Sequence, residues 1–288
     1  MRLSVFLLLG SVAIAPALRP PTSRPIIILV HGRGQLGHDT AALRREWKSD
    51  LDASLSTVGL EKLADADVRL AWYADILDPE SDSGCANARD TQSLGFGTFA
   101  RDMLASMTST IPEQDSRDAR SIVGDLLFVV DPWTRCAAER RVGRVIEAAV
   151  AEHRPVVVVA YSLGSLVTYS YLKSLPPTVR HAADLRLITI GSPLGIREFR
   201  DIVFDNSSDI ILPGTVSSWV NVYDPDDLFA APLADRSTSR VQDRVATRSN
   251  SDAHSIGRYL RDRVTGVAVA QALCAAAKDQ FGEACSRL

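Results

Sequence analysis

Five short runs of β-branched and apolar residues, separated by helical segments, place the tightest limit on the fold. They are Ile26–Val30, Val68–Tyr73, Val156–Ala160, Leu185–Ile190 and Val216–Tyr223. Strands that are apolar on both faces must be covered by helices on both sides, and this arrangement is typical of mostly parallel sheets. The sequence therefore predicts an α/β fold with a mostly parallel central sheet and helices on both of its faces.

Two segments between these runs have the spacing of helices. The first carries apolar residues three and four positions apart, at Val142, Val145, Ile146, Ala149 and Val150. Such spacing places them on one helix face. We expect this helix to end near Arg154, because Pro155 blocks its continuation. The second helix is expected over Leu163–Leu175, stopped by Pro176 and Pro177.

Length and charge narrow the class of protein. The 288 residues fit one large domain, which we place at residues 18–288. The 32 basic and 35 acidic residues give a net charge of −3, and the chain has no block rich in Lys and Arg. Cysteine pairs spaced as in zinc sites are also absent from the sequence. We therefore expect neither a nucleic-acid partner nor a structural zinc ion.

Residues 1–17 have the layout of a secretory signal peptide. Arg2 precedes an apolar stretch, Leu3–Ala15, and small residues follow, with cleavage expected after Ala15 or Ala17. The other interpretations are a buried N-terminal strand or an uncleaved anchor. The apolar stretch is short for a bilayer span, and no other run comes close to one. The sequence thus predicts a secreted or periplasmic protein without a stable membrane span.

The four cysteines form an even set, as expected of two disulfides in an exported chain. Three pairings can be drawn, and we favour Cys85 with Cys136 and Cys274 with Cys285. The first pair would brace the long insertion described next, and the second would pin a C-terminal helix to its tail. Four unpaired thiols are the alternative, and that alternative is favoured if the chain is not exported.

Residues 78–120 interrupt the alternation of strands and helices. They are rich in Asp, Ser, Gly and Thr, with one weak helical patch over Phe99–Met107. A stretch of this length inside a compact domain is usually functional or mobile. A cap or lid over a site and a surface excursion without a role are both open interpretations.

The segment around Ser162 is the most informative about chemistry. A strand of four valines runs into a helix through Ala160-Tyr161-Ser162-Leu163-Gly164. A serine on such a sharp strand-to-helix turn projects its hydroxyl above the sheet edge, and small residues on either side let strand and helix approach. The first N–H groups of the helix also favour negative charge there. Ser162 is therefore the predicted nucleophile.

A serine nucleophile needs a base, and histidine is the usual one at neutral pH. The chain has five histidines: His31, His38, His153, His181 and His254. His153 and His181 are expected at the opposite end of the sheet, and His31 and His38 belong to the first loop. Elimination leaves His254, in a polar loop that opens the final helices.

The base in turn needs a carboxylate on its other ring nitrogen. The strand Val216–Tyr223 is followed by three acids, and ligand sites of open α/β sheets form at such carboxyl ends of strands. We favour Asp227 as this acid, with Asp224 as the alternative. Asp252 is too close in sequence to His254 to be the first choice.

The first strand ends in His31-Gly32-Arg33-Gly34-Gln35. Two glycines allow this loop to approach a substrate oxygen and present N–H donors. The N–H groups of Arg33 and Leu163 are the predicted pair that would hold an oxyanion. A simple glycine turn is the alternative interpretation.

In this order along the chain, these pieces resemble the α/β-hydrolase superfamily, and within it the lipase-like serine esterases. Their nucleophile segment reads Ala-His-Ser-Leu-Gly-Ser, and Tyr161 replaces its histidine here. The segments Ile190–Leu194 and Trp219–Asp227 also look like that group, and the likeness covers roughly residues 25–260. The resemblance implies an α/β-hydrolase fold and ranks Asp227 above Asp224 as the acid.

Residues and resemblance together predict a secreted serine hydrolase that cleaves carboxylic esters through an acyl-enzyme. Ser162 attacks, His254 moves the proton, Asp227 orients the imidazole, and Arg33 and Leu163 hold the oxyanion. This chemistry requires neither metal nor organic cofactor. Two alternatives stay open: an acyltransferase using the same residues, and a binding module without activity. The expected substrate is a small-molecule or lipid ester.

Overall fold

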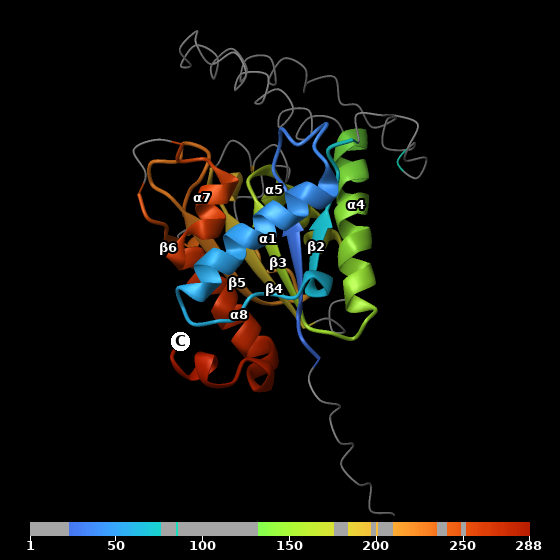
Figure 1. Ribbon diagram of the computed structural model, residues 1–288. Coiled ribbons are helices and arrows are strands. Elements are labelled where there is room, and N and C mark those ends of the chain that lie inside the picture. The colour runs from blue at the N-terminus through green and yellow to red at the C-terminus, as the bar shows by residue number, and fades with distance from the viewer. Residues whose placement is uncertain are drawn as a thin grey trace, which may run out of the picture.

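The chain forms an α/β structure around one parallel sheet (Figure 1). The computed structural model describes residues 23–75, 85, 132–175, 184–196, 200, 210–234, 241–248 and 252–288. Within these ranges the sheet has six strands in the order β2-β1-β3-β4-β5-β6, and every neighbouring pair is parallel. The strands are β1 (Ile26–Val30), β2 (Val68–Ala71), β3 (Val156–Tyr161), β4 (Leu185–Ile190), β5 (Val216–Tyr223) and β6 (Val241–Val245). The predicted α/β class and parallel central sheet are confirmed.

Helices cover both faces of the sheet, as the sequence predicts. In Figure 1 the helices α1 (Thr40–Ser56), α7 (Ile256–Arg261) and α8 (Arg263–Phe281) lie in front of the strands. The helices α4 (Pro132–Val150) and α5 (Leu163–Ser174) pack on the other face. Side chains of β1 point alternately to the two faces of the sheet. Ile26, Ile28 and Val30 pack in the core with α4 and α5, and Ile27 and Leu29 pack in the core with α1 and α8. Short 3-10 turns complete the described chain: η1 (Asp65–Asp67), η4 (Pro193–Gly195) and η6 (Gly282–Ser286).

The strand order has a switch point between β1 and β3. The chain leaves β1 toward β2 on one side and returns to place β3 on the other side of β1. At such a switch point the loops that follow the two strands diverge, and open α/β sheets bind ligands there. The loop at His31–Gly34 and the turn at Ser162 are the segments that follow β1 and β3.

Several element boundaries differ from those expected. Strand β2 ends at Ala71, two residues before the predicted end, and β3 continues to Tyr161. Helix α4 ends at Val150 rather than near Arg154, because the chain turns at His153 with a positive φ of 53°. Strand β6 is not among the predicted strands, since Val241–Val245 contains three polar residues and lies at the edge of the sheet.

Both favoured disulfides are present. Cys85 is bonded to Cys136 of α4, and Cys274 of α8 is bonded to Cys285 of η6. Two disulfides are compatible with an extracellular location, where oxidising conditions preserve them. The predicted signal peptide, residues 1–17, lies outside the described residues, and so does the insertion at 78–120 except for Cys85.

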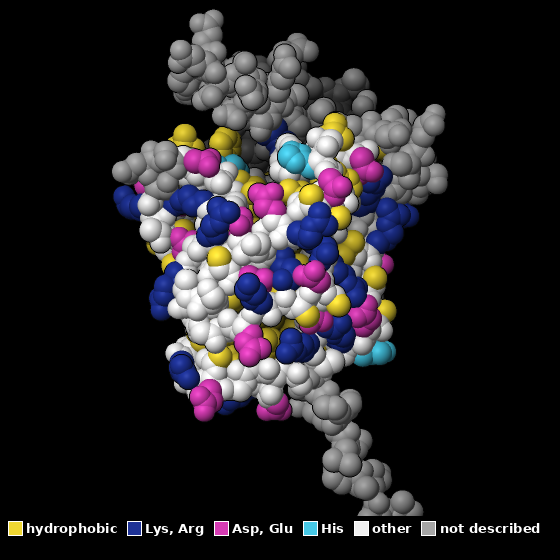
Figure 2. Space-filling model, viewed as in Figure 1, with side chains coloured by type: hydrophobic (Ala, Val, Ile, Leu, Met, Phe, Trp, Pro, Cys, Tyr) yellow, Lys and Arg dark blue, Asp and Glu magenta, His cyan; other side chains and the backbone are white. Residues whose placement is uncertain are grey.

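In the ranges that the structure covers, no helix is long and apolar enough to cross a bilayer. Figure 2 shows Lys and Arg side chains interspersed with Asp and Glu over the face formed by α1, α7 and α8. This mixture accords with the small net charge of the chain.

Candidate active site

Ser162 lies at the turn between β3 and α5, in a backbone conformation that few residues other than glycine adopt. Its φ is 51° and its ψ is −127°, and its side chain makes no capping bond to α5 although it occupies the N-cap position. The backbone N–H of Ser162 donates to the carbonyl of Ile190 on β4, at 3.1 Å. This bond holds the strained turn on the sheet. Because the side chain does not cap α5, its hydroxyl is available for another partner.

Two glycines bring the first loop against this turn. A Cβ on Gly164 would lie 2.3 Å from the carbonyl oxygen of His31, so any side chain there would collide with backbone. A Cβ on Gly32 would lie 2.9 Å from the Cβ of Ser162. The close approach of the loop after β1 and the start of α5 therefore depends on these two residues having no side chain.

The hydroxyl of Ser162 meets the imidazole of His254. Ser162 Oγ and His254 Nε2 are 2.8 Å apart, although the two residues are separated by 92 positions in the chain. On the other side of the ring, His254 Nδ1 lies 2.8 and 3.0 Å from the two carboxylate oxygens of Asp227. The three residues favoured in the sequence thus form one continuous chain of hydrogen bonds.

Asp227 is held in place from three directions. Its side chain is fully buried. The N–H of Phe229 donates to Oδ1 at 2.9 Å, and the hydroxyl of Tyr259 donates to Oδ2 at 2.8 Å. With His254 Nδ1, these groups supply the carboxylate with three donors, which compensate for its removal from water. The carboxylate therefore fixes the tautomer in which Nδ1 carries the proton and Nε2 faces Ser162.

Asp224, the alternative acid, has different partners. One of its carboxylate oxygens accepts from the guanidinium of Arg258, and the other accepts from the N–H of Asp226 at 2.9 Å. Its side chain is also fully buried. The structure thus places Asp224 in an ion pair with α7, whereas Asp227 is the acid in contact with His254.

A buried polar network fixes the far end of the loop that carries Asp227. On β5, Asn221 donates to Asp243 of β6 at 2.8 Å and to the carbonyl of Ala231 at 3.2 Å. The carboxylate of Asp243 in turn accepts from the N–H groups of Leu233 and Ala234. Asn221 and Asp243 thereby hold the end of the loop, at residues 231–234, against the sheet. Sequence reasoning noted Asn221 only as part of a resemblance and did not identify Asp243.

His31 has a structural position in the first loop. Its Nδ1 bonds to the carbonyl of Gly32, its Nε2 accepts the N–H of Tyr73 at 3.0 Å, and its ring stacks on that of Tyr73 with centroids 4.0 Å apart. Burial lowers the pKa of His31 from its ordinary 6.5 to about 4. The ring is therefore neutral at physiological pH and ties the loop after β1 to the end of β2.

The lowered pKa of His31 makes stability depend on pH. The unfolded chain takes up a proton at His31 below pH 6.5, but the folded protein does so only near pH 4. The stabilisation is complete above pH 6.5 and is lost as pH falls toward 4, an effect of about 3 kcal/mol on the free energy of unfolding. Urea denaturation between pH 7 and 4 should show this decrease in the wild type and lack it in His31→Asn.

The matched control is His153→Asn, which replaces an exposed histidine in the turn between α4 and β3. Asparagine tolerates the positive φ of that position, so the fold should be little affected. This variant should keep the wild-type decrease. Parallel pH curves for wild type and His31→Asn would contradict the assignment of the effect to His31.

The predicted oxyanion donors come from the two segments that meet at Ser162. Leu163 is the first residue of α5, and Arg33 follows Gly32 in the loop after β1. Since the Cβ position of Gly32 is within contact distance of Ser162, the backbone of this loop lies beside Ser162. Both N–H groups thus belong to segments beside the hydroxyl, and the positive end of the α5 dipole adds to them.

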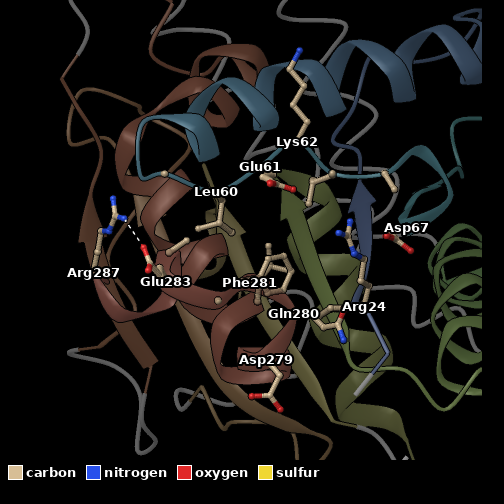
Figure 3. Close-up of a pocket in the computed structure, with 17 residues that line it drawn as sticks. Arg24, Leu60, Glu61, Lys62, Asp67, Asp279, Gln280, Phe281, Glu283 and Arg287 are labelled. Atoms are coloured by element: carbon tan, nitrogen blue, oxygen red, sulfur yellow. Dashed lines mark hydrogen bonds and ion pairs between the residues drawn. The ribbon is translucent and has the colours of Figure 1, made fainter. Parts of the chain in front are cut away.

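Two large apolar side chains are exposed on the loops beside the site. Leu36, in the loop after β1, is 61% exposed, and Leu228, next to Asp227, is 88% exposed. A cavity of about 450 Å³ lies at the opposite edge of the sheet, between the start of β1 and the end of α8 (Figure 3). Its lining mixes apolar residues such as Leu60 and Phe281 with charged ones such as Lys62 and Asp279. This cavity is remote from Ser162 and is not part of the candidate site.

Among the described residues, no cluster of His, Cys, Asp and Glu is arranged to hold a metal ion. No protein-family model matches the chain, and a search of curated proteins finds no matching relative.

Proposed function

We propose that this protein is a serine hydrolase of the α/β-hydrolase superfamily, similar to lipase-like esterases, that cleaves carboxylic esters. The observation that carries the proposal is the hydrogen-bonded chain from Ser162 through His254 to Asp227, on a strained strand-to-helix turn. The order of these residues along the chain, serine then acid then histidine, is that of the superfamily. A carboxylate, an imidazole and a hydroxyl in this geometry are the groups that acyl transfer needs.

In the first half of the reaction, Ser162 Oγ attacks the ester carbonyl while its proton passes to His254 Nε2. The carbonyl oxygen becomes an oxyanion held by the N–H groups of Arg33 and Leu163. Collapse of this intermediate breaks the bond to the alcohol, which takes the proton from His254 as it leaves. The products of this half are the free alcohol and an acyl group bonded to Ser162.

In the second half, His254 accepts a proton from water and the resulting hydroxide attacks the acyl carbon. The oxyanion forms again at the same two N–H groups, and its collapse breaks the bond to Ser162. His254 returns the proton to Ser162 Oγ, and the carboxylic acid leaves. Throughout, Asp227 stabilises the imidazolium and keeps the ring in one orientation.

The surroundings of the site support an apolar substrate met outside the cell. Leu36 and Leu228 expose large side chains on the two loops that flank the nucleophile, so an apolar acyl chain or a lipid ester can bury them. The signal-peptide layout of residues 1–17 and the two disulfides support secretion. The substrate proposed is accordingly a small-molecule or lipid ester.

The proposal is tested by covalent labelling with a fluorophosphonate probe, which reacts with activated serines. The wild type should be labelled and Ser162→Ala should not. Ser170→Ala is the matched control, because Ser170 lies on the same helix and its hydroxyl bonds Glu139 of α4. Labelling of Ser162→Ala at the wild-type rate would contradict the proposal, whereas loss of labelling in the control alone would point to another serine.

A further inference from the structure

Two tyrosines that the proposed reaction does not use are in direct contact with its histidine and acid. Tyr161 immediately precedes the nucleophile, and its hydroxyl donates to the backbone carbonyl of His254. Tyr259 belongs to α7, and its hydroxyl donates to Asp227. The two rings lie 6.3 Å apart, so they form one group, here called the tyrosine pair.

Tyr259 is placed to set the orientation of the acid. Its side chain is completely buried, and its hydroxyl accepts the N–H of Asp224 at 2.9 Å while donating to Asp227 Oδ2 at 2.8 Å. Because the backbone N–H at Asp224 can only donate, the hydroxyl proton must point toward Asp227. Burial, with the nearby carboxylate of Asp227, raises the pKa of Tyr259 far above its ordinary value, which keeps that proton in place.

Tyr161 holds the loop that presents the base. Its hydroxyl bonds the main chain of His254, and its ring centroid lies 5.1 Å from that of the imidazole. The last residue of β3 thus holds the loop of His254 in place, and the next residue is Ser162, the proposed nucleophile. The ring centroid of Phe229 lies 4.9 Å from that of the imidazole, so His254 has two aromatic rings as neighbours.

The packing of the tyrosine pair depends on Gly191, which follows β4. This residue has a φ of +56°, and a Cβ there would lie 2.9 Å from Tyr259, 3.1 Å from Tyr161 and 3.4 Å from Asp227 Oδ2. At this position both rings and the acid approach the same backbone. Absence of a side chain at residue 191 lets the three groups come together.

We propose that Tyr161 and Tyr259 are positioning residues of the active site, one acting on His254 and the other on Asp227. This inference rests on the proposed function. The hydroxyl of Tyr259 holds the Asp227 carboxylate in its contact with the imidazole, and the hydroxyl of Tyr161 holds the main chain of His254 beside Ser162. Both tyrosines are buried, so we expect the pair to affect turnover rather than substrate binding.

The test is the turnover of a short-chain p-nitrophenyl ester by Tyr161→Phe and Tyr259→Phe, which keep the rings and remove only the hydroxyls. Each should lower kcat by about tenfold or more with little change in KM, because a bond to a charged or hydrogen-bonded catalytic group is lost. Tyr169→Phe is the matched control. Tyr169 is a buried tyrosine on α5 whose hydroxyl bonds the main chain of Ile211, and its variant should turn over as the wild type does.

A double-mutant cycle separates positioning from loss of folding. In an Asp227→Asn background, Tyr259→Phe should have little further effect on kcat, because the group that it orients is already gone. Tyr161→Phe should likewise have little further effect in a His254→Ala background, because the base that it positions is then missing. Additive losses for Tyr259→Phe and Asp227→Asn would overturn the role assigned to Tyr259, and additive losses for Tyr161→Phe and His254→Ala would overturn the role assigned to Tyr161.

The outcome for the tyrosine pair is distinguishable from that for the function. If Ser162→Ala turns the ester over as the wild type does, the proposed function fails. If Ser162 is required but both tyrosine variants have wild-type kcat, the positioning role alone fails. An equal loss of kcat in Tyr169→Phe would also overturn the positioning role, because removal of any buried hydroxyl would then explain the effect.

Discussion

Asp227→Asn should lower kcat by about 10⁴-fold while leaving the protein folded. The carboxylate faces three donors: the N–H of Phe229, the hydroxyl of Tyr259 and His254 Nδ1. An asparagine has the same shape but only one acceptor oxygen, and we expect the N–H of Phe229 to donate to that oxygen. The amide NH₂ then faces His254 and forces the proton of the ring onto Nε2. In that tautomer the imidazole cannot accept the proton of Ser162.

Asp224→Asn provides the comparison, because Asp224 is equally buried and only three residues away. Its carboxylate pairs with Arg258, so its loss should reduce stability by on the order of 3 kcal/mol rather than abolish turnover. Ester hydrolysis and urea denaturation of both variants separate the two roles. A larger loss of kcat in folded Asp224→Asn than in Asp227→Asn would reverse the assignment of the acid.

Gly164→Ala should destabilise the protein by about 3 kcal/mol or more and reduce labelling of Ser162. The added Cβ would lie 2.3 Å from the carbonyl oxygen of His31 and 3.0 Å from that of Val30. Both are backbone atoms of β1 and its loop, so relief requires α5 to move away from the sheet. That movement carries the N–H of Leu163 away from the loop that holds Arg33.

The matched control for this variant is Gly59→Ala. Gly59 has a positive φ of 81°, but nothing lies within 4 Å of its Cβ position. Only backbone strain of about 1 kcal/mol is then expected. Thermal or urea denaturation measures the difference between the two variants, and fluorophosphonate labelling measures the effect on the site. Equal destabilisation by both substitutions would show that close packing at Gly164 is not what limits the turn.

The parts of the fold that the sequence predicts correctly are those whose signals are local. The valines of β3 can only be a buried strand, and the prolines after α5 limit where that helix can end. Strand β6 lacks such a signal, because its exposed edge position allows the polar residues Gln242, Asp243 and Arg244. The favoured cysteine pairing is confirmed. It could be predicted because one pair is close in sequence and the other joins the insertion to the helix after it.

The residues of the candidate site likewise fall into those with a local sequence signal and those without one. Ser162 is evident from the strand and turn around it, and its neighbours His254 and Asp227 follow from the end of the sheet at which their loops lie. The roles of Tyr161 and Tyr259 could not be predicted, since each depends on a contact across the fold. Tyr161 touches a residue 93 positions away, and Tyr259 touches one 32 positions away. Both tyrosines look like ordinary core residues in the sequence.

The distance along the chain between Ser162 and His254 affects when a newly synthesised chain can become active. Ser162, its strained turn and both proposed oxyanion segments precede residue 165, but His254, the proposed base, follows Ser162 by 92 residues and lies near Arg258 and Tyr259. A nascent or truncated chain that ends before residue 254 therefore carries a serine without a base. Under the proposed chemistry, a newly made chain stays inert until α7 and α8 have been synthesised and have docked on the sheet.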